Sequence, residues 1–203
     1  MGNERATLQR IITQTKKRRG SEIIRNCLLP QMSTMKRILL LMIAAPLLFI
    51  SCKKKDQCPY SESGATATAS ERAFLANYIS SNNIVALEHS SGVFYNISLP
   101  GTGASPSICS NVTARYTGSL VSNGNVFDGT PAGSPGINFT LGQLIVGWQK
   151  VLPLLKAGGR ISLYIPPSLG YGNRDVTDQQ QPPNVIIPAN SYLKFEIELV
   201  NVQ

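Results

Sequence analysis

The chain is poor in the residues on which most hydrolytic, redox and metal chemistry depends. Its 203 residues include one histidine, His89, one tryptophan and four cysteines. No C-x-x-C pair and no His/Cys/Asp cluster with metal-ligand spacing is present. G-x-S-x-G is also absent, so His89 beside Ser90 and Ser91 gives little support to a serine hydrolase. We therefore expect no metal and no cofactor, and we expect His89 to be an exposed loop residue.

Positive charge is concentrated at one end of the chain. The formal net charge is +8, but residues 1–51 hold nine basic and two acidic residues, whereas residues 52–203 hold ten and nine. The C-terminal three quarters are thus nearly neutral, which argues against nucleic acid as a partner. The basic run at 16–19 resembles a nuclear or nucleic-acid tract. We favour a different explanation, that residues 1–34 are a doubtful leader and that the start codon is Met35 or Met32.

No apolar run is long enough to span a bilayer, which needs about 20 residues. The longest charge-free apolar stretch, 38–50, follows Lys36 and Arg37 and ends at Ser51, which is typical of a secretory signal over 35–51. Cys52 comes next, and the segment resembles a bacterial lipobox. We expect Cys52 to be lipidated, anchoring the protein in the bacterial cell envelope and facing the periplasm, with the outer surface as an alternative. The other interpretation is a signal cut near Ser51 with an ordinary cysteine beyond it.

Two short segments connect this signal to the C-terminal domain. Residues 52–70 are small and polar, which predicts a flexible tether. Ser70 precedes an acidic first turn with apolar residues at i, i+4, so a short amphipathic helix is expected within the connector 71–91. Cys58 and Cys109 remain as possible disulfide partners in an exported protein, and the sequence leaves their pairing open.

The remaining residues, 92–203, alternate between apolar and polar residues over several stretches. Alternation of this kind predicts half-buried strands, and Asn123-Gly124 marks a hairpin. One helix is expected over 144–156, followed by a Gly-Gly turn and a further strand. A polar, proline-rich loop is expected over 173–184. The predicted fold class is α+β, a curved antiparallel β-sheet wrapped around one short α-helix.

The motifs in this domain resemble the FKBP-type peptidyl-prolyl cis-trans isomerase family. They are ARYTG at 114–118, VFDGT at 126–130, FTLGQLIVGWQ at 139–149, LLKAGGRISLYIPPSLGYG at 154–172 and VIIPANSYLKFEIELV at 185–200. The resemblance implies an FKBP-like fold with an apolar pocket between sheet and helix. It also implies catalytic roles at Tyr116, Phe127, Asp128 and Tyr171. Substrate-binding positions would be Leu144, Ile145, Trp148, Ile187 and Phe195.

The resemblance gives individual roles to these positions. Trp148 resembles the pocket floor, and Tyr171 resembles a hydroxyl on its rim. The backbones of Ile145 and Ile187 are expected to meet substrate carbonyls. An isomerase of this kind needs no nucleophile, metal or nucleotide. Water stabilises the planar X–Pro amide more than the twisted one, and an apolar pocket removes that preference and can bind the twisted form better. Taken singly, an aromatic residue on a strand is more often part of the core, so the prediction depends on the whole set.

Three features depart from the family pattern. Ile137 stands where an aromatic wall residue is common. Residues 129–136 lack the arginine that commonly pairs with the Asp128 position, so we expect that side chain either to be less fixed or simply to serve the turn. The 173–184 segment is longer than usual.

The expected function is the isomerisation of X–Pro bonds in unfolded or exported polypeptides by a monomeric protein. The alternatives are a non-catalytic FKBP-like chaperone or peptide-binding module, and an envelope-anchored spacer.

Overall fold

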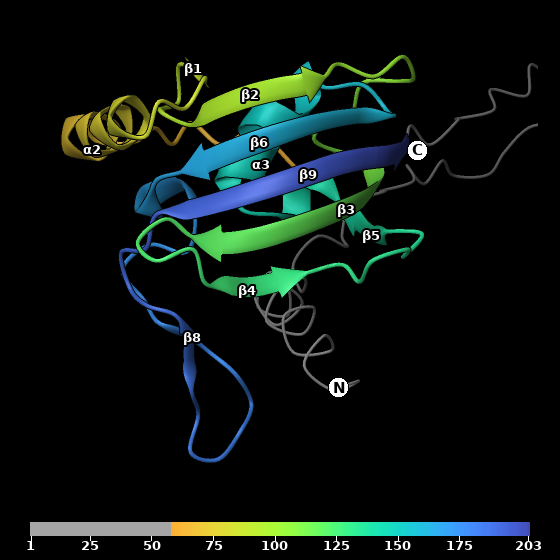
Figure 1. Cartoon of the computed structure of the whole chain (residues 1–203). Helices are drawn as coiled ribbons and strands as arrows, with labels where there is room; N and C mark the ends of the chain where they lie inside the picture. The colour runs from red at the N-terminus through yellow and green to blue at the C-terminus, as the bar shows by residue number, and fades with distance from the viewer. Residues whose placement is uncertain (1–57) are drawn as a thin grey trace, which may run out of the picture.

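The alternating segments form one antiparallel sheet in the computed structural model, which describes residues 58–203 (Figure 1). The predicted leader, the signal and Cys52 lie outside the described residues. The strand order is β1-β2-β6-β9-β3-β4, and β5 also pairs with β3. The strands are β1 (Leu87–Glu88), β2 (Phe94–Leu99), β3 (Asn111–Leu120), β4 (Val126–Gly129), β5 (Ile137–Thr140), β6 (Gly159–Ile165) and β9 (Leu193–Val202).

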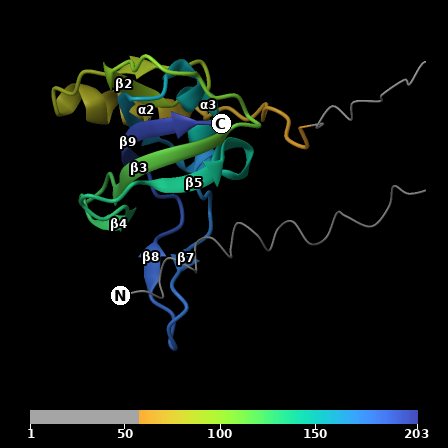
Figure 2. The ribbon, with the colours of Figure 1, turned by 90° about the vertical axis from the view of Figure 1, so that its right-hand side faces the viewer.

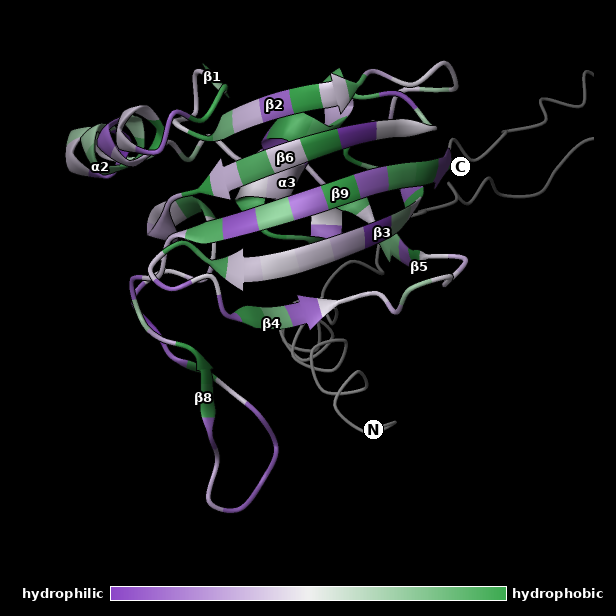
Figure 3. Cartoon of the chain, in the orientation of Figure 1, coloured by the Kyte–Doolittle hydropathy of each residue, from purple (hydrophilic) through white to green (hydrophobic). Residues whose placement is uncertain are grey.

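Strand β9 holds the middle of this sheet. It pairs with β6 on one side and with β3 on the other, so that Ile197 lies between Ile161 and Tyr116. Its apolar residues are buried and alternate with more exposed charged residues, as Figure 3 shows along the strand. This period of two confirms the strand predicted from 193 onward. The sheet curves over one short helix, and the α+β prediction is confirmed.

That helix, α3 (Val146–Val151), is shorter than the helix predicted over 144–156. Ile145 has an extended backbone and serves as its N-cap, and after Val151 the chain tightens into the 3₁₀ helix η2 (Leu152–Leu154). Pro153 lacks the N–H that would continue an α-helix, which explains the early end. A second 3₁₀ turn, η1 (Leu141–Gln143), precedes α3.

The main core lies between α3 and the concave face of the sheet, behind β6 and β9 in Figure 1. The helical segment contributes side chains that are almost completely buried, and so do β6 and β9. These core residues are Trp148, Val151, Leu152 and Leu155 from the helical segment, with Ile161, Leu163, Ile165, Leu193, Phe195, Ile197 and Leu199 from the strands.

The predicted N-terminal helix is present as α2 (Ala69–Ser81), but it begins earlier than Ser70. Its N-cap is Thr68, which forms a capping box with Glu71. Leu75 and Ile79 of α2 pack with Phe94 and other residues in a second, smaller core. Within residues 58–203 no helix combines the length and apolar character needed to cross a membrane.

The tether predicted over 52–70 differs from the structure over its described part. Cys58 forms a disulfide with Cys109, with Cα atoms 5.7 Å apart. Tyr60 packs on Gly142, and its hydroxyl accepts a 2.6 Å hydrogen bond from Gln143. Ala67 is buried in the main core. Small residues allow this close packing. The described part of the predicted tether is therefore packed on the domain, although its composition is typical of a flexible linker.

The predicted loop over 173–184 is part of a small hairpin that projects from the domain (Figures 1 and 2). Its strands are β7 (Val176–Thr177) and β8 (Val185–Ile187). Asp178 and Asn184 close the end of the hairpin through three hydrogen bonds of 2.9–3.0 Å. With only two paired positions, the strands are too short for periodicity to predict them.

Candidate active site

Trp148 lies at the centre of a group of aromatic side chains. It is on the first turn of α3 and is 4% exposed. Its ring meets those of Phe195 and Tyr116 edge to face, with centroids 5.3 and 5.5 Å apart and interplanar angles of 88° and 85°. Such T-shaped pairs are favourable beyond the area that they bury. The arrangement fixes the orientations of these rings within the apolar core.

Two further rings extend this group. Phe127 on β4 meets Phe195 at 5.6 Å, and Phe139 on β5 lies 6.3 Å from Trp148. The prediction included Phe127 but not Phe139. The sequence does carry a signal for Phe139, because it lies two positions from both Ile137 and Leu141 on a predicted strand and therefore shares their inward face.

Two glycines allow the rings and the helix to come this close. A Cβ on Gly118, which pairs with Phe195 across β3 and β9, would lie 2.7 Å from both Phe127 and Phe195. A Cβ on Gly147 would lie 2.6 Å from the side chain of Ile165, so its absence lets α3 approach β6. Larger residues at either position would displace the walls or the floor of the aromatic group.

Asp128 is fixed at the edge of this group by Tyr116. The Tyr116 hydroxyl donates a 2.5 Å hydrogen bond to Oδ2, and the Gly129 N–H donates a 2.8 Å bond to Oδ1. Hydrogen bonds to a carboxylate are short and strong. Of the two expectations for Asp128, a less fixed side chain is wrong, since both oxygens have donors. The alternative, that Asp128 serves the turn, agrees with its bond from the Gly129 N–H.

Tyr171 lies in a turn between Gly170 and Gly172, immediately after the 3₁₀ helix η3 (Pro167–Leu169). It packs against the main core. Burial, and then the negative charge of Asp128, raise the pKa of Tyr171 to about 12. Its hydroxyl therefore stays protonated at neutral pH and can donate a hydrogen bond.

The three remaining predicted positions also pack with this core. Ile187, at the end of β8, is 1% exposed, while Leu144 and Ile145 are half-buried beside α3. The carbonyl of Leu144 accepts a 2.6 Å hydrogen bond from Gln149, and that of Ile145 caps the first turn of α3. The structure thus places all nine predicted site residues in or against one core. The lipidation candidate Cys52 lies outside the described residues.

A separate cavity of about 300 Å³ lies on the other face of the sheet. Arg115 and Thr117 line it and alternate with Tyr116 along β3, so they face away from the aromatic group. Its charged residues pair with each other, as in the contacts of Glu198 with Arg115 and Arg160. Of the predicted site residues, only Tyr116 contributes to the lining of this cavity.

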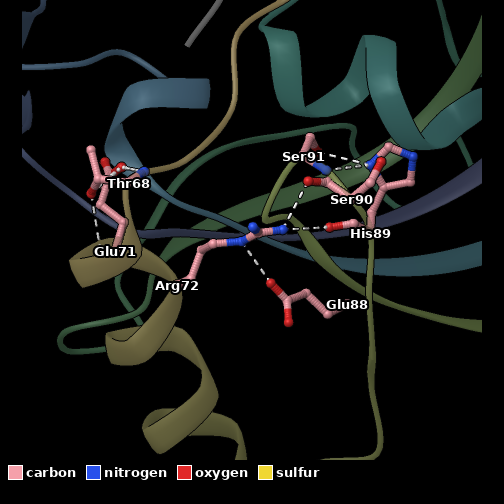
Figure 4. A network of polar contacts seen from close by, with 7 residues as sticks. All are labelled: Thr68, Glu71, Arg72, Glu88, His89, Ser90 and Ser91. Carbon is pink, nitrogen blue, oxygen red and sulfur yellow. Dashed lines mark hydrogen bonds and ion pairs between the residues drawn. The ribbon is translucent and has the colours of Figure 1, made fainter.

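His89 lies in a loop, as predicted, but it is not exposed. It is half-buried, with Nδ1 2.9 Å from the Ser91 hydroxyl and accepting a 3.1 Å hydrogen bond from the Ser91 N–H (Figure 4). Arg72 donates hydrogen bonds to the carbonyls of His89 and Ser90 and pairs with Glu88, which fixes the turn. Burial, followed by the charge of Lys150, lowers the pKa of His89. This polar group packs α2 against the start of β2.

The described part of the chain contains no group of three or more His, Cys, Asp or Glu residues that could hold a metal ion. The candidate site instead combines apolar aromatic side chains, a fixed carboxylate and a protonated phenol. These groups can bind an apolar ring and hydrogen-bond to a carbonyl without forming a covalent bond.

The sequence matches a family model over residues 103–200, described as FKBP-type peptidyl-prolyl cis-trans isomerase. The C-terminal domain belongs to this family. FkpA of Buchnera aphidicola subsp. Schizaphis graminum, an FKBP-type isomerase by name, is 39% identical over 56% of this chain and 42% of its own. The outer membrane protein MIP of Legionella longbeachae is 34% identical over 73% of this chain and 60% of its own.

A solved structure supports the FKBP-type fold. The crystal structure of FkpA from Escherichia coli aligns with a TM-score of 0.54 and 30% identity, covering 66% of this chain and 60% of that one. The chain spans about 40–60% of the length of these two curated relatives. Helix α2 precedes the part that matches the FKBP-type family model.

Proposed function

We propose that this protein catalyses cis-trans isomerisation of X–Pro peptide bonds in unfolded or exported polypeptides. The observation that carries the proposal is the pair of edge-to-face contacts that Trp148 makes with Tyr116 and Phe195, with Asp128 fixed at the edge of this group. An aromatic core alone would not need a carboxylate that is hydrogen-bonded to the hydroxyl of one of its tyrosines. The FKBP-type family membership supports the same activity.

The chemistry requires no covalent step. Rotation about a peptide bond has a barrier of roughly 18–20 kcal/mol because the twisted amide loses its resonance. An apolar site lacks the water that favours the polar planar amide, and can therefore bind the twisted form better. In this proposal the prolyl ring rests on Trp148, and the protonated hydroxyl of Tyr171 and the backbone N–H of Ile187 bind the peptide carbonyls.

A protease-coupled assay on an X–Pro peptide tests the proposal with the full chain. We expect the wild-type protein to accelerate isomerisation above the uncatalysed rate, and both Tyr171→Phe and Asp128→Ala to reduce the acceleration. If all three proteins match the uncatalysed rate, the enzyme proposal is wrong.

The competing function is a module that binds proline-containing segments without catalysis. The projecting β7–β8 hairpin favours it, because Val185 is 50% exposed there and could contact an unfolded chain. Under this alternative, peptide binding would persist in the wild-type protein while the isomerisation rate stayed uncatalysed.

We also propose that Cys52 carries a lipid anchor at the bacterial cell envelope. The Cys58–Cys109 disulfide supports export, because disulfides persist in oxidising compartments. A relative named as an outer membrane protein is consistent with this location. Cys58 follows Cys52 by six positions, and six residues reach at most about 20 Å. The disulfide would therefore hold the domain close to the membrane.

Fatty-acid labelling in a bacterial host tests the anchor. We expect label on the wild-type protein, no label on Cys52→Ser, and a mature chain that begins at Cys52. Label that persists in Cys52→Ser would contradict the assignment. A native peptide from residues 1–30 would contradict the proposed start at Met35 or Met32.

A further inference from the structure

The carboxylate of Glu71 joins two elements that lie 97 positions apart in the sequence. Within α2 it belongs to the capping box, where the Thr68 N–H donates a 2.8 Å bond to Oε2 (Figure 4). It also accepts hydrogen bonds from Ser168 on η3, 2.9 Å from the N–H to Oε1 and 2.8 Å from the hydroxyl to Oε2. One side chain therefore caps α2 and binds the turn that leads to Tyr171.

The bond from Ser168 acts on a single peptide unit. The N–H of Ser168 and the C=O of Pro167 belong to the same planar peptide group. That C=O accepts hydrogen bonds from the N–H groups of Gly170, at 3.0 Å, and Gly172, at 2.9 Å. These glycines flank Tyr171. A carboxylate on one side of a peptide group polarises it and strengthens the bonds on the other side.

A second contact ties α2 to the other side of the same turn. The ring of Phe74 stacks on that of Tyr192, with centroids 4.1 Å apart and an interplanar angle of 21°. Tyr192 lies in the connection between β8 and β9, where the Asn190 N–H donates a 2.8 Å hydrogen bond to the Gly172 carbonyl. Helix α2 thus contacts both segments that meet at the Gly170–Gly172 turn.

We infer that Glu71 is a positioning residue for Tyr171, and that α2, outside the matched family region, sets the geometry of the active-site rim. The inference rests on the proposed isomerase function. A hydrogen-bond donor must be held within a fraction of an ångström to act on a bound carbonyl. The turn that holds Tyr171 receives this restraint from a helix that precedes the family region.

The charge state of Glu71 fits this role. Burial raises its pKa, but the hydrogen bonds from Thr68 and Ser168 outweigh burial, so the pKa of Glu71 is lowered overall. The carboxylate is ionised at neutral pH, and hydrogen bonds to an ionised acceptor are roughly twice as strong as neutral ones.

The first test is a double-mutant cycle in the full chain with Tyr171→Phe. Glu71→Gln is the main variant, because glutamine is compatible with a capping box but supplies one acceptor oxygen and no charge. We expect kcat/KM for an X–Pro peptide to fall roughly 3- to 10-fold, and to fall no further when Glu71→Gln is added to Tyr171→Phe. A full additional loss in the Tyr171→Phe background would overturn the inference.

Two controls separate the effect of the contact between Glu71 and Ser168 from the effect of the N-terminal cap of α2. Glu62→Gln changes an exposed glutamate of the same N-terminal segment that has no hydrogen bond or ion pair in the described structure, and should leave kcat/KM unchanged. Thr68→Ala weakens the cap of α2 but keeps the contact between Glu71 and Ser168, so its effect should be smaller than that of Glu71→Gln. An equal effect would attribute the loss to fraying of the helix.

Amide hydrogen exchange provides a readout that does not require activity. Glu71→Gln should speed exchange at Gly170 and Gly172 by roughly 10-fold, while Leu163 in β6 keeps its protection. Unchanged exchange at both glycines would overturn the positioning role, whatever the activity. An inactive wild-type protein with the expected exchange pattern would instead disprove the isomerase function and leave the restraint on the turn established.

Discussion

The Tyr116 hydroxyl donates a 2.5 Å hydrogen bond to Asp128 while its ring meets Trp148 edge to face at 5.5 Å. One side chain therefore joins the apolar and the charged parts of the candidate site. Tyr116 lies on β3 and Asp128 on β4, and the hairpin between these strands sets their distance.

We expect Tyr116→Phe to keep the aromatic packing and release Asp128. The variant should lose about 1–3 kcal/mol of unfolding free energy, the usual effect of removing a hydrogen bond to a charged group. Its kcat/KM should fall by about 10-fold. Urea denaturation and the isomerase assay measure the two effects. Tyr95→Phe is the matched control, because Tyr95 packs on the same core without a hydroxyl hydrogen bond in the described structure. Equal losses in both variants would show that the contact with Asp128 has no special role.

Trp148 should be more sensitive to loss of its ring than to loss of its N–H. Its buried Nε1 has no hydrogen-bond partner in the described part of the chain. We therefore expect Trp148→Phe to cost about 1–2 kcal/mol and Trp148→Ala about 3–5 kcal/mol, measured by urea denaturation. As the only tryptophan, Trp148 also reports on the site through its fluorescence. An X–Pro peptide that binds without changing this fluorescence would place binding elsewhere.

Tyr171 should make folding stability depend on alkaline pH. Its pKa is raised from 10.0 to about 12, so between these values the folded chain keeps a proton that the unfolded chain has lost. The stabilisation is complete below pH 10 and disappears as the pH rises toward 12, a loss of about 2–3 kcal/mol. Urea midpoints from pH 9 to pH 12 should fall more steeply for the wild-type protein than for Tyr171→Phe. Parallel curves would contradict the burial of this hydroxyl.

His89 should produce an opposite dependence at acidic pH. Its pKa lies below the ordinary 6.5, so folding disfavours the protonated imidazole. The stability contributed by neutral His89 is present above pH 6.5 and is lost as the pH falls through the lowered pKa. We expect His89→Gln to weaken this acid-dependent decline, as measured by urea midpoints between pH 7.5 and pH 5. A decline of the same size in the variant would assign it to other groups.

The Cys58–Cys109 disulfide should stabilise the domain measurably. It connects residues 51 positions apart, and closing a loop of that length typically contributes about 2–4 kcal/mol. The double Cys→Ser variant should unfold at lower urea concentration than the oxidised wild-type protein. Adding a reductant should shift the wild-type midpoint and leave that of the variant in place. An unchanged midpoint in the variant would contradict this contribution.

Much of the fold could be predicted because its main signals are local. The period-two pattern at Leu193, Phe195 and Ile197 depends only on which face of a strand is buried. The FKBP-type motifs then supplied what periodicity cannot, namely which aromatic residues meet around Trp148. The family prediction and the fold class are confirmed by the family match and the structure.

The parts that the sequence did not predict depend on contacts between distant segments. The contact of Glu71 with Ser168 and the burial of Ala67 have no local pattern. The predicted C-terminal end of α3 was wrong because the apolar periodicity continues through Pro153, whereas the α-helical backbone hydrogen bonds stop before it. The family pattern places a partner for Asp128 among arginines of the following loop, whereas Tyr116 on the neighbouring strand supplies the donor.

Exchange NMR on an X–Pro peptide tests the central claim most directly, because it observes the cis and trans forms without a protease. A catalytic amount of the wild-type full chain should produce exchange cross-peaks between the two forms on a timescale of about a second or less, whereas the free peptide needs tens of seconds or more. Asp128→Ala should weaken these cross-peaks. Shifted peptide resonances without exchange cross-peaks would show binding without catalysis and would contradict the proposed isomerase function.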